Sequence, residues 1–159
     1  MNKSPEFEVH TRREFCSRAC MAASFLAAGA IVGCGGGPAS PSSVSAPPLA
    51  SVNATVAGRL VSIALDGAAA LTPVGSAALV RTSLGAFLVA HTGQDTYTAL
   101  NATCTHESNT VTGFADGRYV CTFHGSQFTT SGSVASGPAN RALTQYPTQV
   151  SGTTLTFTV

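Results

Sequence analysis

The sequence predicts an all-β domain that follows a separate N-terminal segment. The chain has 159 residues, of which 44% are hydrophobic and only 9% are charged, and this length favours one domain with an appendage. Beyond the N-terminal segment, strong helix formers are few, and β-branched residues alternate with small ones, as is typical of strands. Gly-containing turns separate these runs, which favours a sandwich or barrel of short strands.

The strands are expected wherever such a run lies between two turn signals. In chain order they are 56–65, 77–82, 86–92, 97–102, 111–114, 118–121, 126–130 and 155–159. Asp66-Gly67 and Ser83-Leu84-Gly85 supply turns, and Gly137-Pro138 marks a loop. The triplet Ala115-Asp116-Gly117 is a strong hairpin signal between two of the strands.

The first 33 residues are expected to be an export signal. Half of the eight basic residues of the chain lie here, including the pair Arg12-Arg13, and an apolar run follows at 19–33. A charged region before a short apolar region is typical of secretory signals, and the paired arginines resemble a twin-arginine (Tat) signal. The apolar run is shorter than the roughly 20 residues of a membrane-spanning helix, and a retained membrane anchor is the alternative.

The apolar run ends in Ile31-Val32-Gly33-Cys34, which resembles a bacterial lipobox. This resemblance predicts that Cys34 is lipidated and becomes the new N-terminus; the alternative is an ordinary cysteine near a cleavage site. Residues 34–51 are rich in Gly, Pro and Ser, which predicts a linker and leaves 52–159 as the domain. We therefore expect a periplasmic domain, or one tethered by lipid to the outer face of the cytoplasmic membrane. Since the Tat route exports folded proteins, it also indicates a cofactor inserted in the cytoplasm.

Two cysteines and two histidines of the domain form the candidate metal site, as Cys104-x-His106 and Cys121-x-x-His124. A disulfide between the cysteines of an exported protein would leave both histidines unexplained. Two thiolates and two imidazoles suit a tetrahedral Zn²⁺ ion. They equally suit a [2Fe–2S] cluster with two Cys on one iron and two His on the other.

The spacing resembles that of the Rieske family: C-x-H, fourteen residues, then C-x-x-H followed by Gly125-Ser126. The run ALNATCTH and the later Gly137-Pro138-Ala139, Leu143 and Tyr146 add to a resemblance that covers about 80 residues. It implies a Rieske-type antiparallel sandwich or barrel with a small cluster-binding subdomain inserted in it. The cofactor that it implies is a [2Fe–2S] cluster, with the buried iron on Cys104 and Cys121 and the outer iron on His106 and His124.

The sequence departs from the high-potential Rieske branch of cytochrome bc complexes. That branch has an extra cysteine in each ligand loop, and the two form a disulfide; here the positions are Asn109 and Phe123. It also has a tyrosine at the position of Phe128. Ser126 is retained, and the resemblance implies that its hydroxyl group donates a hydrogen bond to the cluster.

These features predict an exported one-electron carrier without catalysis of its own. Its partners would be a redox protein donor and acceptor, such as a cytochrome or the large subunit of an oxidoreductase, and the membrane that holds its lipid tether. The net charge of +1 gives no reason to expect a nucleic acid. The alternatives are the Rieske subunit of a quinol-oxidising bc-type complex, the small subunit of a periplasmic oxidoreductase and an exported zinc-binding module.

Overall fold

The structure is a computed structural model that describes residues 43–159. Within this range it holds three β-sheets, one short 3-10 helix, η1 (Ala69–Leu71), and no α-helix, which confirms the predicted all-β class. No helix in this part of the chain is long and apolar enough to cross a membrane. The signal expected at 1–33 and the lipidation site expected at Cys34 lie outside the described residues.

The central sheet has five strands. In spatial order they are β1 (Ala50–Val52), β4 (Ala77–Thr82), β5 (Gly85–Gly93), β6 (Thr96–Asn101) and β11 (Gln145–Tyr146). Only the β1–β4 pair is parallel. The remaining pairs are antiparallel: short turns connect β4 to β5 and β5 to β6, and β11 pairs with β6 after the long segment 102–144.

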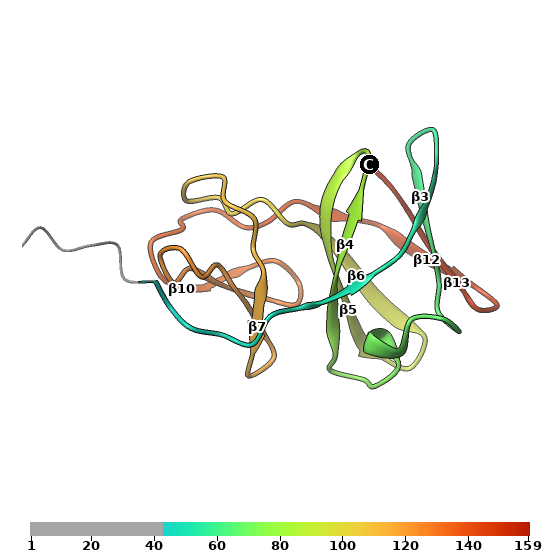
Figure 1. The fold of residues 1–159 in the computed structure, drawn as a ribbon, viewed down its shortest axis with the longest axis horizontal. Helices are drawn as coiled ribbons and strands as arrows, with labels where there is room; N and C mark the ends of the chain where they lie inside the picture. Colours follow the sequence, from blue (N-terminus) through green and yellow to red (C-terminus); the bar gives the residue numbers. More distant parts are fainter. Residues whose placement is uncertain (1–42) are drawn as a thin grey trace, which may run out of the picture. The chain divides into compact units, whose positions relative to one another are not determined.

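Two four-stranded antiparallel sheets accompany the central sheet (Figure 1). The outer sheet contains β12 (Thr148–Ser151), β13 (Thr154–Thr158), β3 (Leu60–Ala64) and β2 (Thr55–Ala57). The small sheet contains β10 (Val134–Ser136), β9 (Gln127–Thr129), β8 (Arg118–Val120) and β7 (Gly113–Ala115). All strands of the small sheet lie in the chain between β6 and β11, which confirms the expected inserted subdomain.

The central sheet is apolar on both faces because a different core covers each. On β4, Ala78 and Val80 pack with residues of the outer sheet, whereas Leu79 packs with residues of the small sheet. Side chains alternate between the two faces of a strand, so a strand covered on both sides reads as a continuous apolar run. Cys104 and Cys121 belong to the core shared with the small sheet. The two candidate cysteine ligands are therefore fixed by the same packing that holds the subdomain on the central sheet.

The region predicted as one strand at 56–65 consists of two strands. Gly58, with φ +62°, reverses the chain, so that β2 folds back antiparallel onto β3. The expected hairpin at Asp116-Gly117 is confirmed: both residues have positive φ, and β7 pairs with β8. The strands β1, β10, β11 and β12 were not predicted, because they are short and lie in Ser- and Thr-rich stretches.

The linker predicted for 34–51 ends too late in the sequence. Its described part, from residue 43 onward, is packed on the domain. Leu49 is buried in the core that holds the cysteines, and β1 begins at the next residue. Pro47 accepts a hydrogen bond from the N–H of Phe114 through its carbonyl oxygen. Proline lacks an N–H donor but keeps its acceptor, so a Pro- and Ser-rich composition does not prevent such packing. We call residues 43–49 the strap.

Candidate metal centre

The two ligand loops have the same hydrogen-bonded frame. In the first loop (104–109), the N–H of Cys104 donates to the carbonyl oxygen of Asn109, and the N–H of Ser108 donates to that of Cys104. In the second loop (121–126), the N–H of Cys121 donates to Ser126 and that of Gly125 donates to Cys121. The four donor–acceptor distances are 2.8–2.9 Å. Each loop is therefore a compact turn that begins at a cysteine and carries a histidine within it.

The fifth residue of each loop has a left-handed backbone conformation. It is Ser108 in the first loop, with φ +59°, and Gly125 in the second, with φ +75°. Glycine adopts this conformation without the steric cost that a Cβ atom adds. At Ser108 the surrounding hydrogen bonds impose it instead, which is a local strain of the kind that gathers at functional sites.

The cysteines form the buried part of the centre. Cys104 and Cys121 are 2% and 1% exposed, and both are free thiols rather than a disulfide. Burial raises the pKa of the Cys121 thiol above its ordinary value, and the hydrogen-bonded side chain of Cys104 raises it further. The backbone N–H groups of Phe123 and His124 act in the opposite direction, because they donate to the Cys121 sulfur. Two adjacent buried sulfurs thus disfavour the thiolate form until a cation compensates the charge.

The histidines form the accessible part of the centre. The ring centroids of His106 and His124 are 5.0 Å apart, and the rings meet edge to face. His106 is exposed, whereas the side chain of His124 is 21% exposed. The exposed carboxylate of Glu107 lies 3.5 Å from Nδ1 of His124. The centre is therefore polarised, with sulfur donors inside and imidazole donors at the surface.

The donor positions fit two metal ions better than one. Among the described residues, the group of three or more His, Cys, Asp or Glu side chains with all ligand atoms within 4.8 Å of one another is His106, Glu107 and His124. Neither cysteine belongs to it. Two ligands of one zinc ion lie at most about 4.6 Å apart, since the Zn–S and Zn–N bonds are about 2.0–2.3 Å long. No three of the four candidate ligands in the described chain lie that close to one another, which suits a cluster with one iron on each pair of ligands better than a single ion.

The segment 137–141 packs on both loops. Ser126 is fully buried, and its Oγ accepts a hydrogen bond of 3.1 Å from the N–H of Ala139. The hydroxyl of Thr105 in the first loop donates to the carbonyl oxygen of Arg141 at 2.6 Å. Because Oγ is the acceptor in this bond, the hydroxyl group of Ser126 keeps its own proton as a donor.

The structure brings together all the site residues that the sequence predicted within the described chain. Cys104, His106, Cys121 and His124 converge, and Ser126 closes the second loop. Sequence reasoning missed Glu107, although its place directly after His106 could have suggested it. It also missed the N–H of Ala139, because a backbone donor carries no side-chain signal.

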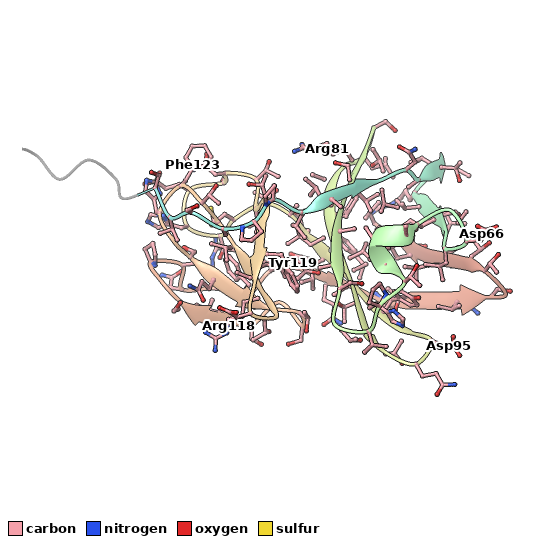
Figure 2. All side chains as sticks on the ribbon, turned by 60° about the horizontal axis from the view of Figure 1, so that its bottom comes forward. Asp66, Arg81, Asp95, Arg118, Tyr119 and Phe123 are labelled. Atoms are coloured by element: carbon pink, nitrogen blue, oxygen red, sulfur yellow. The ribbon has the colours of Figure 1, made fainter. Side chains whose placement is uncertain are left out.

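Tyr119 and Phe128 belong to the same core as the two cysteines. They face each other across β8 and β9, and both are fully buried in the core that contains the cysteines. Tyr119 lies where the small sheet meets the central sheet (Figure 2). Its hydroxyl group is buried without a hydrogen-bond partner in the described structure, and burial raises its pKa.

Comparison with known proteins identifies the domain. The family model of the Rieske [2Fe-2S] domain matches residues 61–147, which is more than half of the chain. Among solved structures, the cyanobacterial plasma membrane Rieske protein PetC3 from Synechocystis PCC 6803 is 36% identical. That match covers 52% of this chain and 86% of the other, with a TM-score of 0.48. A search of curated proteins found no match. The matched region contains both ligand loops, and the chain belongs to the Rieske family, whose domain binds a [2Fe–2S] cluster.

Proposed function

We propose that the protein is an exported one-electron carrier whose cluster is held by Cys104, Cys121, His106 and His124. The observation that carries this proposal is the separation of the four donors into a buried sulfur pair and a surface imidazole pair. When bound, the cluster supplies a centre that accepts and releases one electron. The protein around it supplies the ligands, excludes water from the sulfur side and leaves the imidazole edge accessible.

The ligand types set the charge of the centre. Two neutral imidazoles in place of two thiolates make the bound group less negative, which favours electron uptake relative to an all-cysteine site. The N–H groups that point at the Cys121 sulfur stabilise negative charge there. The exposed carboxylate of Glu107 acts in the opposite sense, although solvent weakens its effect.

The accessible imidazole edge is the place where a redox partner would approach. His106 and His124 lie there, and beside them an apolar groove is lined by Phe123, Thr122 and the first residues of the strap. Phe123 is 54% exposed. We infer that the donor and acceptor are proteins, such as a cytochrome or an oxidoreductase large subunit.

The purified protein tests the cofactor and the electron count together. We expect iron and acid-labile sulfide in a one-to-one ratio, visible absorption and EPR signals of a [2Fe–2S] cluster, and a reversible one-electron wave in voltammetry. A colourless protein that contains one zinc ion would instead favour the zinc-binding alternative.

Replacing Ser126 with alanine is expected to lower the reduction potential by roughly 40–90 mV. A donated hydrogen bond stabilises the reduced state more, because that state carries the extra negative charge. Hydrogen bonds to charged groups contribute about 1.5–3 kcal/mol. A difference of about 1–2 kcal/mol between redox states gives this shift, since about 59 mV corresponds to a factor of ten for one electron. The measurement is voltammetry of both proteins at one pH, and equal potentials would show that the hydroxyl does not reach the cluster.

Export and tethering are tested at the N-terminus. We propose that Arg12-Arg13 directs Tat export and that Cys34 is lipidated, on the basis of the paired arginines, the short apolar run and the sequence Ile31-Val32-Gly33-Cys34. Changing both arginines to lysine should retain cluster-loaded protein in the cytoplasm. Mass spectrometry of the mature protein should find a lipid-modified Cys34 as the first residue. A mature chain that starts at an unmodified residue beyond 34 would refute lipidation but not export.

A further inference from the structure

The second ligand loop is confined by two segments that are distant from it in sequence. The first is 137–141, which lies within the family-matched region. A Cβ atom on Gly137 would lie 2.6 Å from Cα of Ser126, and the N–H of Ala139 donates to Oγ of Ser126. This segment therefore contacts the last residues of the loop.

The second segment is the strap. The N–H of Val44 donates to the carbonyl oxygen of Thr122 at 3.1 Å. A Cβ atom on Gly125 would lie only 2.7 Å from Cγ2 of Val44, so the valine side chain occupies the space that the glycine leaves open. Figure 2 shows Phe123 of the loop beside the first residues of the described chain. The strap thus contacts the loop on both sides of His124.

The rest of the strap is fixed to the small sheet and to the core. The N–H of Phe114 donates to Pro47, and the N–H of Leu49 donates to Thr112 at 2.7 Å. A Cβ atom on Gly113 would lie 2.8 Å from Cβ of Ala46. Leu49 is buried with both cysteines. Because of these contacts the strap is a defined element of the folded domain and can restrain the loop that it touches.

We propose that the strap is a positioning element of the cluster site, which holds the second ligand loop in its ligating conformation. This inference rests on the ligand set of the proposed function, in which this loop supplies Cys121 and His124. No disulfide joins the two loops, because Asn109 and Phe123 stand where the high-potential Rieske branch has its two extra cysteines. The strap precedes the family-matched residues 61–147, so it is a feature of this chain outside the matched domain. Because the strap is the N-terminal part of the domain, it connects the preceding segment of the chain to the second ligand loop.

The test compares Val44→Asp with Val74→Asp in the full chain with its cluster. Both replace a surface valine, and Val74 lies in the connection before β4, outside the strap and the ligand loops. Aspartate at 44 places a charge against Gly125, and we expect cluster loss to a chelator to accelerate about fivefold, which corresponds to about 1 kcal/mol. The EPR g-values should also shift, since His124 and Ser126 flank Gly125. Val74→Asp should leave both quantities at their wild-type values.

Two further measurements separate positioning from general stability. Val44→Thr keeps the β-branched shape and should give a smaller acceleration than Val44→Asp. Hydrogen exchange of the wild-type protein should show protected amides at Val44, Leu49 and Phe114, and this reports strap docking even in protein without a cluster. Equal rates of cluster loss and unchanged g-values in Val44→Asp and Val74→Asp would overturn the proposal, as would an unprotected Val44 amide.

Discussion

Replacing Cys121 with serine is expected to abolish the cluster. Cys121 is 1% exposed and is one of only two thiols in the described chain, so no third thiol of residues 43–159 can take its place. A serine oxygen is a much harder donor than a thiolate sulfur and loses its proton far less readily, whereas iron–sulfur clusters select thiolate ligands. We expect loss of iron, sulfide, visible absorption and EPR signal. His124→Ala should have the same outcome, since it removes one of the two imidazoles.

Matched controls exist for both ligand types. Cys34 lies outside the described residues, and Cys34→Ser in protein purified from the cytoplasm should retain full iron and sulfide content. His91 lies on β5, where its ring stacks on Tyr97 and its Nδ1 lies 3.1 Å from the carbonyl oxygen of Thr72. His91→Gln should lower stability but keep the cluster spectrum. A wild-type spectrum in Cys121→Ser or His124→Ala would contradict the proposed ligand set.

The ligand pattern could be read from the sequence because it is local. Each cysteine has its histidine two or three positions later, so one turn of backbone carries both residues. The three long strands of the central sheet, β4, β5 and β6, were equally readable, because burial on both faces leaves continuous apolar runs. The inserted subdomain was implied only by the family resemblance, since composition alone does not indicate which strands share a sheet.

The remaining features of the site depend on contacts between distant segments. No local signal indicates that Ser108 adopts the same left-handed conformation as Gly125, because the hydrogen-bonded frame of the first loop imposes it. The strap was assigned to a linker because its composition is typical of one. Its packing arises from backbone donors and acceptors, which every sequence carries. A close contact at a glycine, unlike a backbone hydrogen bond, can be tested by substitution, because replacement with alanine adds one methyl group at that point.

Gly137 and Gly75 form a matched pair for such a test. Their φ angles are +89° and +88°, so a side chain at either position meets nearly the same backbone strain. They differ in their surroundings. A Cβ atom on Gly75 would have nothing within 4 Å, whereas one on Gly137 would lie 2.6 Å from Cα of Ser126 and 2.7 Å from the carbonyl oxygen of Gly125. These are backbone atoms of the second ligand loop, and they cannot move aside by a change of rotamer.

Gly137→Ala is therefore expected to be far more damaging than Gly75→Ala. A left-handed conformation costs a residue with a Cβ atom about 1–3 kcal/mol, and both variants should lose this much free energy of unfolding. At Gly137 the close contact should add about 1–3 kcal/mol, the usual cost of forcing an atom into a packed site. For a domain of about 100 residues, an added 2 kcal/mol lowers the Tm by roughly 8–16 °C relative to Gly75→Ala.

The displaced loop should also lose the hydrogen bond between Ala139 and Ser126, so Gly137→Ala should bind the cluster poorly while Gly75→Ala retains it. Thermal unfolding and iron content of the two purified variants measure both effects, and equal Tm values would show that segment 137–141 does not press on the ligand loop.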